Sequence, residues 1–113
     1  MTDVAVMQGT LDVIVLKALL WGPMHGYAVT RWIKDTTDGA LDVEEGALYP
    51  ALHRLERRRA VESQWGLSEN NRRAKFYRLT ASGRRELRSE TAAWQRYAAI
   101  IAKVLATPAP GAA

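Results

Sequence analysis

The order of hydrophobic periodicities along the chain is the feature that most restricts its fold. Apolar side chains recur at helical spacing in three short segments, then alternate with polar ones, and return to helical spacing over one long segment. A chain of 113 residues has room for one core. The sequence therefore predicts a mainly α fold of the α+β class, with a small β-hairpin and a long C-terminal helix. The predicted helices are 8–21, 26–36, 44–58 and 81–106, and the predicted strands are 61–65 and 75–79.

Turn residues and capping residues mark the ends of these segments. Gly22 and Pro23 end the first helix, because proline cannot continue the hydrogen-bond ladder. Thr80 is suited to cap the N-terminus of the last helix. Pro50 lies inside the third helical segment, so we expect its regular part to begin nearer Tyr49.

These segments group into a folded domain, 8–80, a C-terminal helix, 81–106, and a tail, 107–113. The tail is rich in Pro, Gly and Ala and is predicted to be disordered, and residues 1–8 are expected to form a loose arm. The N-terminus lacks the basic segment of a secretory signal, and the longest apolar run is too short to span a bilayer. We therefore expect no membrane partner and a cytoplasmic location.

Positive charge is concentrated in the middle of the chain. The net charge is +4, and the segment 44–85 carries ten Lys and Arg against five Asp and Glu, whereas the segment 1–43 carries three against five. A localised basic surface is what a polyanionic partner requires. The alternative is a solvated basic face without a partner.

The third helix and the hairpin hold the residues that we expect to contact a partner. Leu48, Leu52 and Leu55 form its core stripe, so the opposite face carries polar groups. On that face Tyr49 and His53 are candidates for reading bases, and the expected DNA-contacting set as a whole is Tyr49, His53, Arg54, Arg57, Asn70, Asn71, Arg72, Arg73 and Lys75. We assign Arg54, Arg72, Arg73 and Lys75 mainly to phosphates.

Three short helices followed by a basic hairpin is the order of a winged helix-turn-helix domain. An α-helix fits the major groove of DNA, and a neighbouring hairpin lays cations along the phosphates. The sequence therefore predicts a DNA-binding domain. A protein-interaction module with the same fold but no DNA affinity is the alternative, while an enzyme has no constellation of residues to support it.

The last helix predicts a homodimer. A heptad seam and a second apolar stripe run along it, and one small domain can cover only one of them. The alternative is that both stripes pack on the chain's own core. The residues expected in the dimer interface are Leu87, Trp94, Tyr97, Ala98, Ile101, Val104 and Leu105.

Several kinds of site are not expected. The chain has no cysteine and only two histidines, His25 and His53, which lie far apart in the sequence, so no metal site and no cofactor are predicted. No phosphate-binding loop or nucleophile motif is present. Trp21, Tyr27 and Trp32 are expected in the core rather than in a ligand site.

Three stretches closely resemble the PadR family of transcriptional regulators. They are GTLDVIVLKALLWGPMHGY (Gly9–Tyr27), EEGALYPALHRLERR (Glu44–Arg58) and SENNRRAKFYRLTASGRR (Ser68–Arg85). The resemblance covers about 8–105. It implies a winged-helix domain, a C-terminal helix that pairs two subunits, and repression through a palindromic operator. The single C-terminal helix resembles the branch of the family without a larger C-terminal domain.

The resemblance also implies roles for particular residues. It places Tyr49, His53 and Arg54 on the recognition helix. It places on the wing Asn70, Asn71, Arg72, Arg73 and Lys75. Ala47 departs from the family pattern, which often has Ser or Thr there, so we expect one hydroxyl contact, either to DNA or to the start of the helix, to be missing. Trp94 matches the place where a tryptophan of similar proteins stacks on a flat aromatic effector. Plain packing of Trp94 across the dimer interface is the alternative.

Overall fold

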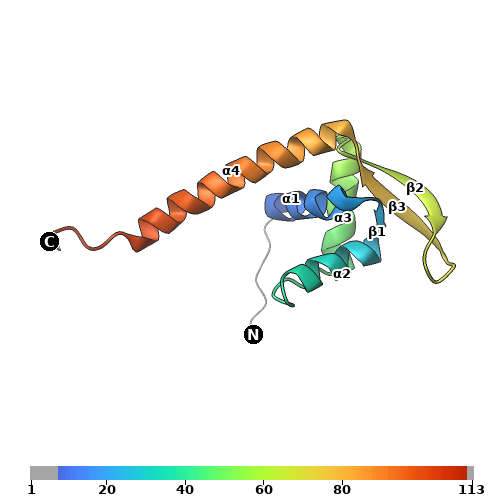
Figure 1. Cartoon of the computed structure of the whole chain (residues 1–113), viewed down its shortest axis with the longest axis horizontal. Helices are drawn as coiled ribbons and strands as arrows, with labels where there is room; N and C mark the ends of the chain where they lie inside the picture. The colour runs from blue at the N-terminus through green and yellow to red at the C-terminus, as the bar shows by residue number, and fades with distance from the viewer. Residues whose placement is uncertain (1–7, 112–113) are drawn as a thin grey trace.

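A computed structural model describes residues 8–111 and confirms the mainly α fold with a small antiparallel sheet (Figure 1). Three short helices form a compact domain with the sheet at one end, and the last helix runs away from it. In chain order the elements are α1 (Gln8–Ala18), the 3-10 helix η1 (Leu19–Trp21), β1 (Met24–His25), α2 (Gly26–Thr36), α3 (Glu45–Arg57), β2 (Val61–Leu67), β3 (Arg73–Leu79) and α4 (Ala81–Ala106).

The core lies where α1, α2 and α3 meet the base of the sheet. The predicted stripe of α3, Leu48, Leu52 and Leu55, is fully buried together with Ala51. Burying a leucine side chain contributes about 1.5–3 kcal/mol, so this stripe is a main source of the domain's stability. It also fixes α3 in one orientation, which turns the opposite face of the helix outward.

The N-terminal end of α3 differs from the sequence-based expectation. The helix begins at Glu45, not near Tyr49, and the amides of Ala47 and Leu48 both donate to the carbonyl oxygen of Glu44 at 3.0 Å. Pro50 therefore lies within the helix. Its missing N–H leaves the carbonyl of Gly46 without its helical donor, and Gly46 is exposed, so water can satisfy that oxygen.

The sheet has the strand order β1-β3-β2, with both pairs antiparallel. Strands β2 and β3 are longer than predicted and pair from Val61↔Leu79 to Leu67↔Arg73. The chain reverses in the loop 68–72, in which Ser68 N donates to Arg72 O at 2.8 Å and Asn71 has a positive φ of 57°. Asparagine tolerates this left-handed conformation, as the bulge of such a hairpin requires. The two-residue strand β1 was not predicted.

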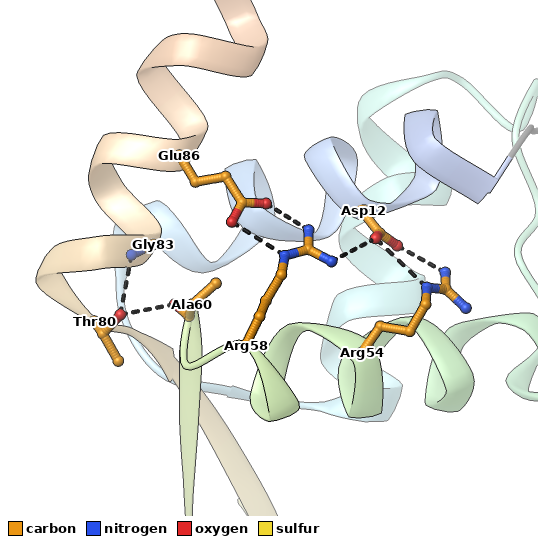
Figure 2. Close-up of polar contacts among 7 residues, drawn as sticks. All are labelled: Asp12, Arg54, Arg58, Ala60, Thr80, Gly83 and Glu86. Carbon is orange, nitrogen blue, oxygen red and sulfur yellow. Dashed lines mark hydrogen bonds and ion pairs between the residues drawn. The ribbon is translucent and has the colours of Figure 1, made fainter.

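The root of α4 is fixed against the start of β2 (Figure 2). The predicted cap is present, because Gly83 N donates to Thr80 Oγ1 at 3.0 Å. The Thr80 amide donates to the carbonyl oxygen of Ala60 at 3.1 Å, and its hydroxyl donates to the carbonyl oxygen of Arg59 at 2.6 Å, with the Ala60 oxygen 3.2 Å away. A Cβ at Gly83 would lie 1.9 Å from that same oxygen, so only glycine allows this approach. Leu87, one turn further on, is buried in the core.

Beyond Leu87 no residue of α4 is buried. The helix passes alongside α1 and then extends past it, and every residue from Ala92 to its end is exposed (Figure 1). Residues 107–111 are exposed and outside regular secondary structure. Residues 1–7, most of the expected loose arm, and 112–113 of the expected disordered tail lie outside the described residues. None of the described helices combines the length and apolar character needed to cross a membrane.

Candidate nucleic-acid interface

A groove of about 560 Å³ lies between the start of α2, the outward face of α3 and the hairpin. It is rich in aromatic and ring-bearing side chains and has cations at its hairpin edge. Its lining residues are His25, Gly26, Tyr27, Tyr49, His53, Trp65, Ser68, Glu69, Asn70, Arg73, Ala74, Lys75 and Tyr77. The structure thus brings together residues of the third helix and of the hairpin that the sequence singled out separately.

The outward face of α3 presents His53 and Arg57, both exposed, and His53 lines the groove. Tyr49 is half-buried and packs against the start of α2, where a Cβ at Gly26 would lie 2.5 Å from the Tyr49 hydroxyl oxygen. The Tyr49 ring therefore joins α2 to α3 and shows only part of its surface to the groove.

Arg54 is not free on this face. Its Nη2 donates to Asp12 Oδ1 at 2.7 Å, and its Nε is 3.5 Å from Asp12 Oδ2 (Figure 2). Asp12, on α1, is only 8% exposed. Since the guanidinium is already held by a buried carboxylate, we correct its assignment from a phosphate contact to a structural contact between α1 and α3.

The hairpin has two different faces, because side chains alternate along a strand. Val61, Tyr77 and Leu79 are buried against the domain, and the same face continues outward as Trp65 and Arg73. This inner face is the one that lines the groove. Its change from apolar to cationic follows from the hairpin reaching beyond the core.

The cations of the hairpin have different surroundings. Arg73 is exposed, and its Cζ lies 4.6 Å from the centroid of the Trp65 ring. Lys75 is half-buried, with its Nζ 4.0 Å from Glu56 Oε1, so part of its charge is balanced within the protein. At the tip, Asn70, Asn71 and Arg72 are all exposed.

Two residues of this surface, Trp65 and Tyr27, and Arg31 beside Tyr27 were missed by the sequence reasoning. Trp65 was treated only as part of the strand alternation, and Tyr27 was expected in the core but is exposed. Arg31 donates from Nη1 to Tyr27 Oη at 3.2 Å, and this hydrogen bond is the main cause that raises the pKa of Arg31. The i, i+4 spacing of Tyr27 and Arg31 is the signal that would have found them. Trp21 was also expected in the core and is exposed.

The pKa values of Tyr77, which lines the groove, and of Arg58, at the end of α3, are also shifted. Burial, followed by the negative charge of Glu56, raises the pKa of Tyr77 above 10.0. The hydrogen bond with Glu86 is the main cause that raises the pKa of Arg58. Tyr77 is therefore neutral and Arg58 positive at physiological pH.

The free part of α4, residues 92–106, carries an exposed apolar surface. Trp94, Tyr97, Ile101, Val104 and Leu105 are all exposed on it, as are Ala98 and Ile100. The expectation that Leu87 belongs to this surface is wrong, because Leu87 packs in the core of its own domain. The alternative in which both stripes pack on that core is also wrong, because the residues beyond Leu87 lie outside it.

Trp94 and Tyr97 form an aromatic pair on this surface. Their ring centroids are 5.8 Å apart and their planes are tilted by 32°. Both rings border a groove of about 280 Å³ between α4 and the start of α1, which Val13 also lines. Among the described residues, no group of three or more His, Cys, Asp or Glu side chains could hold a metal ion.

Comparisons with known proteins agree with this arrangement. The chain is 30% identical to a transcriptional regulator from Clostridium thermocellum, with a TM-score of 0.77 over 85% of this chain and 93% of that one. It is 33% identical to a PadR family transcriptional regulator from Eggerthella lenta, with a TM-score of 0.77 over 89% and 86%. It is 25% identical to Bacillus subtilis PadR, solved in complex with operator DNA, with a TM-score of 0.64 over 72% and 47%.

The similarity extends to the family level. Residues 15–89, which include α2, α3 and the whole hairpin, match the family described as transcriptional regulator PadR-like. The matched segment is most of the chain and contains the groove between α3 and the hairpin. This protein belongs to the PadR-like family of transcriptional regulators.

Proposed function

We propose that this protein is a sequence-specific DNA-binding repressor that acts as a homodimer on a palindromic operator in the cytoplasm. The observation that carries the proposal is the groove in which the outward face of α3 meets the cationic inner face of the hairpin. An exposed helix with a flanking basic hairpin suits a major groove and its neighbouring phosphates. The complex of Bacillus subtilis PadR with operator DNA supports the same role.

Residues of the groove take different parts in this proposal. His53 and Arg57 project from α3 toward base edges and nearby phosphates. The hairpin residues Asn70, Asn71, Arg72, Arg73 and Lys75 contact phosphates. Tyr49 reaches DNA only with its exposed edge and mainly sets the angle between α2 and α3, while Arg54 supports α3 from behind.

The dimer forms through the free part of α4. Its exposed apolar side chains are too many and too contiguous for a stable monomer surface, and a second copy of the same helix is the simplest partner to bury them. The interface residues are Trp94, Tyr97, Ala98, Ile101, Val104 and Leu105. Two-fold pairing places the two recognition helices on half-sites about one DNA turn apart.

A small planar aromatic molecule is the proposed effector. The exposed Trp94 and Tyr97 rings, tilted toward each other beside a groove, offer faces on which such a molecule stacks. Binding there would alter how the two α4 helices pack. Quenching of Trp94 fluorescence, absent in Trp94→Leu, would support this role, whereas identical titrations of both proteins would leave Trp94 with packing alone.

Footprinting on the intergenic DNA next to the gene is the decisive experiment, run over a salt series with and without a panel of planar aromatic compounds. We expect two protected half-sites with two-fold symmetry and an affinity that falls steeply with salt, because phosphate contacts release counterions. Absence of any salt-sensitive protection would overturn the proposal in favour of a protein-interaction module. A change in protection with one compound would identify an effector and show whether it releases or tightens DNA.

A further inference from the structure

Trp65 is a large aromatic side chain on the outer part of the hairpin, and it is 56% exposed. It is directly opposite Lys75 in the register of β2 and β3 and diagonal to Arg73 on the same face. Its ring faces the groove that α3 also lines. Nothing in the hydrophobic core requires an indole at this place, because the buried part of that face ends at Tyr77.

The cations of α3 and of the hairpin are restrained in different ways. Arg54 is held by Asp12, Lys75 lies 4.0 Å from Glu56, and Arg78, on the outer face of the hairpin, is 2.7 Å from Glu62. Each of these cations has part of its charge balanced by a carboxylate. Within residues 8–111, no carboxylate oxygen is within 4.0 Å of the guanidinium of Arg73, which lies over the Trp65 ring instead.

We propose that Trp65 is a positioning residue for DNA binding, which holds the guanidinium of Arg73 at the mouth of the groove for contact with a backbone phosphate. This inference rests on the proposed function. The contact with the ring face occupies the guanidinium with no carboxylate, so its N–H donors remain available for phosphate oxygens. An arginine held in place in this way loses less side-chain entropy on binding than a free one.

The aromatic platform also keeps the charge of Arg73 intact. A carboxylate would fix the side chain equally well but would compete with the phosphate for the same donors and weaken the field at the groove. Glu69 at the loop lines the groove as well, and it is the one acidic side chain among the lining residues. An indole face restrains the cation without adding a second negative charge beside Glu69.

The test measures the affinity of the full-length protein for a DNA duplex of mixed sequence over a range of salt concentrations. Arg73→Ala should lower the slope of log affinity against log salt by about one, because one phosphate contact is lost. Trp65→Leu, which keeps an apolar side chain but has no π face, should lower the slope in the same direction. The double variant should be no weaker than Arg73→Ala alone.

Two further variants complete the test. Trp65→Phe should recover most of the affinity lost in Trp65→Leu, since phenylalanine restores an aromatic face. Arg78→Ala removes a cation from the same strand on its outer face and should leave the slope unchanged. A slope cannot be lowered by a mere reduction in the fraction of folded protein, so a structural role for Trp65 would not reproduce this pattern.

The outcomes separate this inference from the proposed function. If the wild-type protein shows no salt-sensitive binding, the proposed function fails and the inference fails with it. If Arg73→Ala lowers the slope while Trp65→Leu keeps the wild-type slope, DNA binding stands and only the role of Trp65 is overturned. The role of Trp65 would also be overturned if Trp65→Leu lowered the DNA affinity equally in the wild-type and in the Arg73→Ala background. The tryptophan would then act independently of the arginine.

Discussion

The guanidinium of Arg58, at the end of α3, forms a two-point contact with the carboxylate of Glu86 on α4 (Figure 2). Its Nε donates to Glu86 Oε1 at 3.1 Å, and its Nη1 donates to Asp12 Oδ2 at 3.3 Å. Arg54 binds the other oxygen of Asp12. A single chain of charges therefore joins α1, α3 and α4, and it sets the direction in which α4 leaves the domain.

Asp12→Ala should destabilise the domain by about 2 kcal/mol, because two arginines lose the buried carboxylate between them. This estimate is reduced from that of a fully buried pair because Arg58 is partly exposed. Urea unfolding measures the effect. Glu62→Ala, which removes an exposed pair with Arg78, should change stability by less than about 0.5 kcal/mol. Equal effects of the two substitutions would contradict the structural role of Asp12.

Arg54 and Arg57 should separate stability from DNA binding. Arg54→Ala should lower the free energy of unfolding by about 1–2 kcal/mol, because it leaves Asp12 with one partner fewer. Arg57→Ala, on the exposed face, should leave stability unchanged and lower the salt slope of DNA binding by about one. If folded Arg54→Ala protein lost more DNA affinity than Arg57→Ala, Arg54 would again count as a phosphate contact.

Gly83→Ala should destabilise the protein by about 3 kcal/mol or more, because the added Cβ would overlap the carbonyl oxygen of Ala60. Thermal or urea unfolding provides the measurement. Gly46→Ala is the matched control within a helix, since a Cβ at Gly46 meets nothing within 4 Å. That control should stabilise α3 by up to about 1 kcal/mol through helix propensity. A tolerated Gly83→Ala would mean that α4 does not approach β2 this closely.

Tyr77 should make the fold sensitive to alkaline pH. Burial raises its pKa above 10.0 in the folded protein, so the unfolded chain loses this proton first as pH rises. Stability is therefore complete below about pH 10 and is lost as pH rises toward the pKa of the folded state. Tyr77→Phe should flatten this fall in urea-unfolding experiments near pH 8 and pH 10.5. Tyr27→Phe, which changes an exposed ring, should show the same decrease in stability with pH as the wild type. If Tyr77→Phe showed that decrease as well, Tyr77 would not be its source.

Ile101→Glu should convert the proposed dimer to monomers without unfolding the domain, because Ile101 lies on the free part of α4 and outside the core. Placing a charge in an apolar interface costs far more than placing it in water. Sedimentation velocity gives the mass, and circular dichroism checks the fold. Gln95→Glu introduces the same carboxylate on another face of α4 and should leave the dimer intact. A wild-type monomer at micromolar concentration would refute this interface.

The helices were predicted well because their signals are local. The bounds of α2 and α4 and the Thr80 cap follow from spacing and capping residues, and the structure confirms them. The predicted start of α3 was wrong because of Pro50. Proline removes the hydrogen bond to the carbonyl of Gly46, but Gly46 is exposed, so that carbonyl needs no partner within the helix. The strand β1 is defined only by its pairing with Tyr77 and Phe76, which two residues of sequence do not reveal.

The candidate site was predicted in outline, but the partners of its charges were not. Arg54 and Asp12 are 42 residues apart in the sequence, and no periodicity connects them. Trp65 and Arg73 meet because of the register across the hairpin, which the sequence left open. A sequence shows how many cations a segment carries, whereas the folded chain decides which of them are already neutralised.

The length of α4 determines how strongly the geometry of the proposed dimer responds to a change in the angle between its two α4 helices. Its 26 residues form a helix of about 39 Å, and its buried residues, Gly83 and Leu87, lie in its first two turns. Where two such helices cross, a small change in the crossing angle displaces each winged-helix domain, and the displacement grows with the distance of the domain from the crossing point. A flat molecule bound between the two α4 helices would therefore change the spacing and orientation of the two winged-helix domains relative to the DNA duplex. The structure within each domain would stay the same.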